Sequence, residues 1–173
     1  MRKISLAVAV AFCLAAAFTV QSATKGTIKV VSPGIALELK IGTTPAPVPT
    51  GKEVPMAPGT YTPARITCGA KGPGEIWTIK STGPFGELKE IIVAEGQVTN
   101  IEAGPPFTVK VSVSNPSGAG GKPALIGMMI IGKSGEVYAP NTLMKGLSVG
   151  PKPQFKIVDE KGTTITQGAF EYG

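Results

Sequence analysis

Apolar and polar residues alternate with a period of two along most of the chain, which is the pattern of β-strands with one buried face. The pattern is longest in 35–41, where Ile and Leu alternate with Ala, Glu and Lys, and in 107–114, where Phe and Val alternate with Thr, Lys and Ser. Shorter segments of the same character are 27–31, 61–68, 75–80, 88–93, 97–102, 153–158 and 164–172. Gly and Pro residues separate them, and no run of about ten residues after the first 23 has a helical pattern. The sequence therefore predicts an all-β protein.

The first 23 residues have the composition of a secretory signal peptide. Arg2 and Lys3 precede an apolar run over 4–20, and the small residues Ser22 and Ala23 follow it. We expect removal of residues 1–23 and an exported protein that is periplasmic, at the cell surface or extracellular. Because about 17 apolar residues is the short limit for a membrane-spanning helix, an uncleaved anchor is the alternative, and it would be the chain's contact with a membrane.

The segment 103–106, with the sequence Ala-Gly-Pro-Pro, is the best candidate for a domain boundary. Two adjacent prolines remove two backbone donors and stiffen the chain. The division gives 24–104 and 105–173, each long enough for a small β-sandwich. One continuous sandwich is the alternative. A second proline-rich segment, 43–51, is predicted to be a loop or an edge segment, because its prolines cannot donate regularly to a sheet.

The motif Pro58-Gly59-Thr60-Tyr61 lies between two strand-like segments. Residues 91–101 have the pattern of an apolar strand, a turn at Glu95-Gly96 and a further strand. Together these resemble the carboxypeptidase regulatory-like and PEGA-type modules, which are small transthyretin-like β-sandwiches, over about residues 26–103. The resemblance implies that the turn joins two antiparallel strands and that Tyr61 packs inward. The second part of the chain is similar to Ig-like sandwiches of exported bacterial proteins. The two resemblances imply antiparallel sandwiches in tandem, transthyretin-like and then Ig-like, with an accessory or structural role and no catalytic residue.

The amino-acid composition excludes several kinds of catalytic and binding site. Its 173 residues include no histidine, which excludes Ser-His and Cys-His nucleophilic catalysis and histidine-ligated zinc. Without Arg2 and Lys3, 15 of the 17 basic residues remain against 11 acidic ones, a net charge of +4, and they are scattered singly. Nucleic-acid binding needs a basic cluster with arginines, whereas only Arg65 remains. We expect no enzymatic activity, no cofactor and no nucleic-acid partner.

Several motifs have a reactive and a structural interpretation. Residues 127–134 match the phosphate-loop expression, but four bulky apolar residues fill its middle, so we predict a strand, a hairpin turn and a return strand, and no bound nucleotide. Cys68 is the one cysteine after residue 23, lacks a histidine to activate it, and is predicted to be a buried or half-buried structural residue. The acidic residues could pair for glycoside hydrolysis, but most lie opposite apolar strand positions or in turns, where we expect them to be solvated. They do not cluster as a metal-binding loop requires.

Two features point to binding. The segment 124–131 is apolar on both faces, whereas a sandwich strand usually shows one face to water. Its second face is buried against 24–104, covered by a loop, or available to a protein partner or a second copy. The candidate interface is Leu125, Ile126, Met128, Met129, Ile130 and Ile131. Trp77 is a candidate ligand platform for sugar stacking, although Ile76 and Ile79 beside it favour a position in the core.

These patterns favour a non-catalytic exported structural or binding module of the cell envelope or surface that acts through protein–protein contacts. Two alternatives stay open. One is a secreted carbohydrate-binding or glycan-active protein that uses glutamates with Trp77. The other is a self-assembling fibre or coat subunit that assembles through 124–131.

Overall fold

The computed structural model describes residues 24–114 and 125–171, so the predicted signal peptide, 1–23, lies outside the described residues. The described chain consists of β-strands and one short 3-10 helix, η1, and contains no α-helix. The all-β prediction is confirmed. No helix in this part of the chain is long and apolar enough to cross a membrane.

Nine strands precede residue 105: β1 (Gly26–Val30), β2 (Ile35–Ile41), β3 (Thr44–Val48), β4 (Glu53–Met56), β5 (Gly59–Tyr61), β6 (Pro63–Lys71), β7 (Ile76–Ser81), β8 (Ile91–Val93) and β9 (Val98–Ile101). The helix η1 (Gly86–Lys89) lies between β7 and β8. Six strands follow: β10 (Thr108–Ser114), β11 (Leu125–Ile131), β12 (Val137–Lys145), β13 (Ser148–Val149), β14 (Gln154–Val158) and β15 (Thr164–Ala169).

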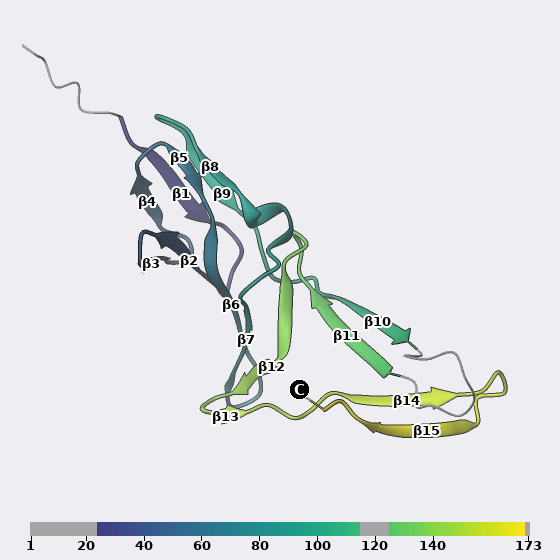
Figure 1. The fold of residues 1–173 in the computed structure, drawn as a ribbon. Helices are drawn as coiled ribbons and strands as arrows, with labels where there is room; N and C mark the ends of the chain where they lie inside the picture. Colours follow the sequence, from purple (N-terminus) through teal and green to yellow (C-terminus); the bar gives the residue numbers. More distant parts are fainter. Residues whose placement is uncertain (1–23, 115–124, 172–173) are drawn as a thin grey trace, which may run out of the picture.

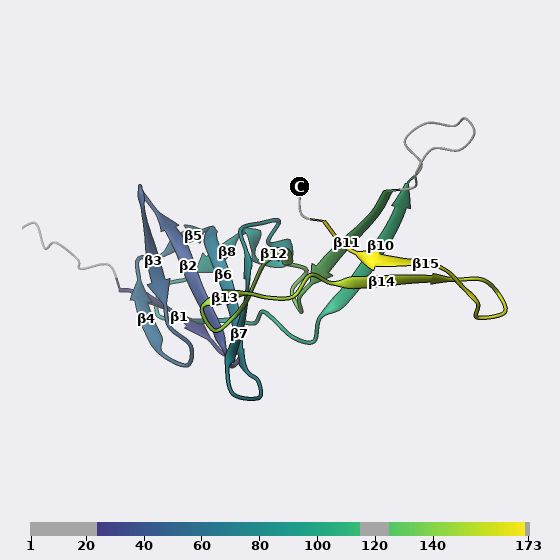
Figure 2. The ribbon, with the colours of Figure 1, turned by 90° about the horizontal axis from the view of Figure 1, so that it is seen from below.

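The strands form one large sheet and three small ones (Figures 1 and 2). The large sheet has the order β10-β11-β12-β7-β6-β2-β3, and β13 pairs with β12. A three-stranded sheet has the order β4-β1-β9, and β5–β8 and β14–β15 are two-stranded. The pair β1–β9 is parallel, and the other strand pairs are antiparallel.

The hydrophobic core lies between the small sheets of the first part of the chain and the β2–β6–β7 region of the large sheet. In β2 the alternation of the sequence places Ile35, Leu37 and Leu39 inside, at 1% exposure or less. They meet Ile28 and Val30 of β1 in one buried cluster, which extends through β8 and β9. Among the described residues after 105, Tyr138 of β12 is the one member of this cluster. Strands that follow β12 therefore add little to the core.

The large sheet runs through both of the predicted units. Strand β12, from the unit 105–173, pairs with β7, from the unit 24–104, and Ala139 lies opposite Lys80. The register shifts between Ala139 and Met144, where Thr142 Oγ1 accepts from the Lys80 N–H at 2.9 Å. The division at residue 104 and the choice between one sandwich and two stay predictions, and the hydrogen-bonded sheet crosses that point.

Several boundaries differ from the prediction for local reasons. The strand predicted over 88–93 begins at Ile91, because Gly86 with a φ of +58° starts η1 and the Leu88 N–H donates to the Phe85 carbonyl. The proline-rich segment 43–51 forms the edge strand β3, which confirms the edge alternative. The turn at Pro58-Gly59 leads from β4 to β5, which belong to different sheets, and Tyr61 packs against the core cluster.

Candidate interaction surface

The antiparallel ribbon β10–β11 carries a group of exposed apolar side chains: Val109, Val111, Val113, Leu125 and Met129. In its register, Val109 lies opposite Ile130, Val111 opposite Met128, and Val113 opposite Ile126. Residues that lie opposite one another in an antiparallel pair share a face, so these six side chains form one apolar face, which we call the valine face. The three valines are 56%, 61% and 69% exposed. The other face combines Leu125, Met129 and Ile131 with the polar residues of β10.

The predicted interface residues of β11 divide along the strand. Ile130, at its end near β12, packs against the core cluster. Leu125 and Met129 are 58% and 45% exposed. Ile126, Met128 and Ile131 are half-buried. The structure therefore places one end of the segment against the body of the protein and leaves the other end in solvent, and its role as a partner surface stays a prediction.

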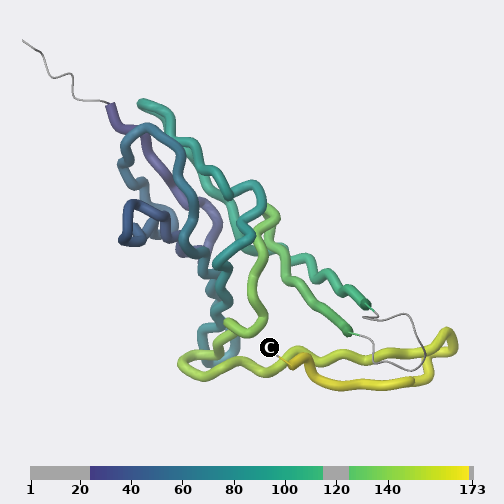
Figure 3. Tube along the Cα trace, in the orientation of Figure 1, coloured from purple at the N-terminus to yellow at the C-terminus, as the bar shows by residue number. Residues whose placement is uncertain are grey.

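The valine face lines one side of an open groove, and strand β14 with Phe170 lines the other. The groove has a volume of about 420 Å³. Its walls are Val109, Val111, Val113, Ile126, Met128, Gln154, Phe155, Lys156, Ile157 and Phe170. Both ribbons project from the same side of the molecule (Figure 3). Within residues 24–114 and 125–171, neither strand of the hairpin pairs with a further strand.

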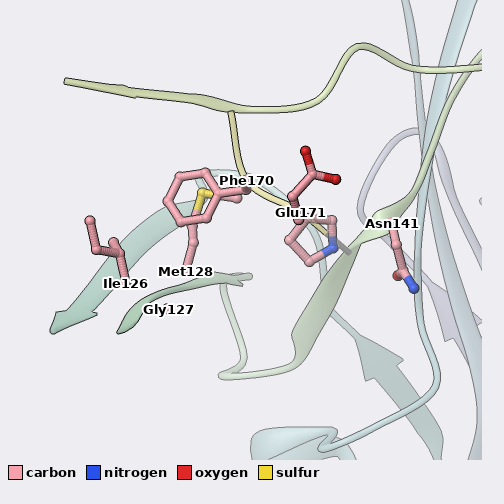
Figure 4. Close-up of a pocket in the computed structure, with 7 residues that line it drawn as sticks. Ile126, Gly127, Met128, Asn141, Phe170 and Glu171 are labelled. Atoms are coloured by element: carbon pink, nitrogen blue, oxygen red, sulfur yellow. The ribbon is translucent and has the colours of Figure 1, made fainter. Parts of the chain in front are cut away.

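A smaller cavity of about 220 Å³ lies where the C-terminal segment meets β11. Figure 4 shows the Phe170 ring beside Met128, with Glu171 and Asn141 farther along the cavity. Phe170 also meets Phe155 edge to face at 5.5 Å between ring centroids, and Lys152 forms an ion pair with Glu171. The aromatic contact and the ion pair fix Phe170 and Glu171 relative to the start of the β14–β15 hairpin.

Trp77, the candidate sugar platform, is half-buried on β7. The ammonium group of Lys145 lies 5.7 Å from its ring centroid. A Cβ on Gly72 would lie 2.7 Å from Cδ1 and Nε1 of the indole, so the ring also lies close to the Gly72 backbone. A stacking platform needs a free ring face, and these neighbours occupy space around the indole. The role of Trp77 as a ligand platform stays a prediction.

The predicted hairpin at 127–136 and the predicted burial of Cys68 are confirmed. Strand β11 ends at Ile131 and β12 returns antiparallel, with Ile130 opposite Tyr138. Residues 127–131 are strand, without the loop of free amides that holds a phosphate. Cys68 is a free cysteine with 6% exposure, and burial, with a smaller contribution from the Glu136 charge, raises its pKa. A raised pKa keeps the thiol protonated and unreactive.

A buried carboxylate at the β11–β12 turn is the feature that the sequence analysis missed. Glu136 is 0% exposed, although we expected the acidic residues to be largely solvated. Its Oε1 accepts from the Gly104 N–H at 2.6 Å and from the Tyr138 hydroxyl at 3.1 Å, and its Oε2 accepts from the Ser134 N–H at 2.9 Å. Burial first, and then the Glu136 charge, raise the pKa of Tyr138. The position of Glu136 two residues before Tyr138, on the same strand face as a core aromatic residue, is the signal that could have identified it.

This cluster joins the two predicted units. The Lys133 N–H donates to the Gly104 carbonyl at 2.8 Å, and the Glu87 N–H donates to the Ser134 carbonyl at 2.8 Å. Both oxygens of the buried Glu136 carboxyl group accept hydrogen bonds, so neither is left without a partner. The arrangement therefore positions the backbone at the start of the β10–β11 ribbon. In the described residues, no group of three or more His, Cys, Asp or Glu side chains is placed to hold a metal ion.

Comparison of the chain with protein-family models, with curated proteins and with solved structures finds no match. The resemblances to transthyretin-like and Ig-like modules therefore stay predictions from the sequence.

Proposed function

We propose that this protein is a non-catalytic exported module of the cell envelope or surface that acts through protein–protein contacts made by the β10–β11 ribbon. The observation that carries the proposal is the valine face, whose three β10 valines are each more than half exposed. Contiguous exposed apolar surface of this kind marks interaction sites in soluble proteins. Scattered apolar residues would need no such explanation.

The rest of the chain fits the role of a scaffold. Among the described residues, the core cluster comes from residues before 105 and from Tyr138, so the ribbon is a projection from a packed body. The Glu136 cluster attaches the base of the ribbon to that body through Gly104. Rigid support of an exposed ribbon is what a binding module needs, because less ordering entropy is lost when it binds.

Export is supported by the basic start, apolar run and small residues within 1–23. The tandem of a transthyretin-like and an Ig-like sandwich is supported by the resemblances of the sequence. The mass of the protein from the producing cells tests export: we expect a chain that lacks the first 22 or 23 residues. A full-length mass would contradict cleavage and favour the anchor.

Photo-crosslinking in the producing cells tests the contact. A benzophenone amino acid at Val113, which belongs to the valine face and is 69% exposed, is compared with the same residue at Ile92, which is 66% exposed on β8. We expect protein adducts from position 113 and few from position 92. The absence of adducts at position 113, or equal adducts at both positions, would contradict a specific role for the valine face.

A further inference from the structure

Strand β10 is a sheet edge that has neither proline nor a bulge. It is the terminal strand of the large sheet, and within the described part of the chain no strand pairs with its outer side. All seven of its residues are exposed, and Lys110 is its one charged residue. Natural proteins usually shield an exposed edge with proline, lysine, a bulge or a covering segment, because its free N–H and C=O groups pair readily with another strand. Along β10 the ladder to β11 runs over all seven residues without a bulge.

The opposite edge of the same sheet is protected. Strand β3 contains Pro45 and Pro47, which lie opposite Lys40 and Glu38 of β2. Alternate residues of an edge strand direct their backbone groups away from the sheet, and proline is tolerated at those positions because its missing donor faces solvent. The outer side of β3 therefore lacks donors at two consecutive outward positions. The large sheet is open to strand pairing at its β10 end and restricted at its β3 end.

We propose that β10 pairs antiparallel with β10 of a second copy, about a two-fold axis at Val111, to form a closed dimer. This inference deepens the proposed function and rests on it, because it identifies the contact partner as the same chain. A two-fold contact uses the same patch on both copies and closes after two chains. The restricted β3 edge is consistent with a dimer and disfavours an open fibre built edge to edge.

The register follows from the sequence of β10, which reads Thr-Val-Lys-Val-Ser-Val-Ser. An axis at Val111 pairs all seven residues, places Val109 opposite Val113 of the second copy, and joins the two valine faces on one side of a four-stranded sheet. It also places Lys110 opposite Ser112. An axis at Lys110 would place two lysines directly opposite each other, and like charges in that position destabilise a strand pair. An axis between two residues would put valine opposite a polar residue throughout.

Light scattering after size-exclusion chromatography of the protein as purified from its producing cells tests the dimer. Over a hundredfold range of concentration, we expect the mass to rise from one chain to two. Val111→Lys places two charges at the axis and should weaken the dimer at least about tenfold. The matched control is Ile92→Lys, an equally exposed apolar strand residue that should leave the dimer unchanged. One chain at every concentration, or a dimer equally sensitive to both variants, would overturn the proposal.

Single cysteines test the register without relying on a lysine that could disturb the ribbon. Directly opposite residues in an antiparallel pair have Cα atoms about 4.5 to 5.5 Å apart, within reach of a disulfide. Val111→Cys should therefore crosslink to itself under mild oxidation. Val109→Cys should crosslink slowly alone and rapidly when mixed with Val113→Cys. Buried Cys68 provides the background in the unmodified chain. Crosslinking of Val111→Cys no faster than that of Val109→Cys would overturn the register.

The outcome separates this inference from the proposed function. A monomer whose benzophenone at position 113 still forms adducts with another protein would refute self-pairing and leave the contact function intact. A dimer that forms adducts only with its own chain supports both the self-pairing and the contact function.

Discussion

Replacing Glu136 tests whether a buried carboxylate joins the base of the β10–β11 ribbon to the body of the protein. In Glu136→Ala, the N–H groups of Gly104 and Ser134 and the hydroxyl of Tyr138 lose their acceptor. Each buried donor left unsatisfied costs about 1–3 kcal/mol, which for Gly104 and Tyr138 alone amounts to about 2–6 kcal/mol. Loss of the carboxylate's own desolvation cost offsets part of this. We expect the free energy of unfolding to fall by about 3 kcal/mol, a large share of the roughly 5–15 kcal/mol of a typical domain.

Glu136→Gln separates the charge from the shape. A glutamine oxygen at the Oε1 position still accepts from Gly104 and Tyr138, whereas its amide nitrogen cannot accept from Ser134. Hydrogen bonds to a neutral acceptor are about half as strong as those to a carboxylate. The expected loss is about 1–2 kcal/mol, so the unfolding free energies should rank wild type above Gln and Gln above Ala.

Urea unfolding followed by fluorescence measures these differences. Trp77 is the single tryptophan of the chain and lies on β7, opposite Lys145 of β12. The control is Glu53→Gln, which removes an exposed ion pair with Lys29 and should change the unfolding free energy by no more than about 0.5 kcal/mol. If Glu136→Ala loses no more stability than this control, the buried hydrogen bonds do not hold the junction and the reasoning is refuted.

Three further predictions concern the same cluster. Gly132→Ala should lower the free energy of unfolding by about 1–3 kcal/mol, because the new Cβ would lie 2.1 Å from Oε1 of Glu136. The control Gly69→Ala, whose new Cβ would have its nearest neighbour at 3.6 Å, should leave the urea midpoint almost unchanged. Equal midpoints for the two variants would contradict the close approach at Gly132. Because Cys68 is buried and its pKa is raised, its thiol should react with an aromatic disulfide at least about 100-fold more slowly in the folded protein than in the urea-unfolded chain. Equal rates in the two states would contradict the burial of this thiol. The raised pKa of Tyr138 implies stability that is complete below the unfolded pKa of 10.0 and is lost as pH rises above it, because the unfolded tyrosine ionises first. Tyr138→Phe should therefore flatten the alkaline fall of the urea midpoint, and an unchanged slope would count against it.

The candidate surface could be predicted in part from the sequence. The apolar character of 124–131 identified β11 as a strand with two faces to cover, but the valines of β10 carry more of the exposed surface. Their alternation with Thr, Lys and Ser indicates a strand that buries its apolar side. The structure instead leaves that side facing an open groove, because the core cluster ends near Tyr138 and Ile130. Burial depends on what packs over a strand, which no local pattern specifies.

The sequence by itself determined the all-β character and the position of most strands, although η1 replaces the start of the strand predicted over 88–93. Alternation specifies which side chains of β2 and β10 share a face, and Gly and Pro specify where strands stop, because both effects act over a few neighbouring residues. Only the tertiary structure decided that β12 pairs with β7, that β1 lies parallel to β9, and that Glu136 is buried beneath Gly104. These contacts join residues far apart in the chain, and many pairings satisfy the same alternation. In the pairing that forms, every buried side-chain nitrogen and oxygen of the described residues has a hydrogen-bond partner, including both carboxylate oxygens of Glu136.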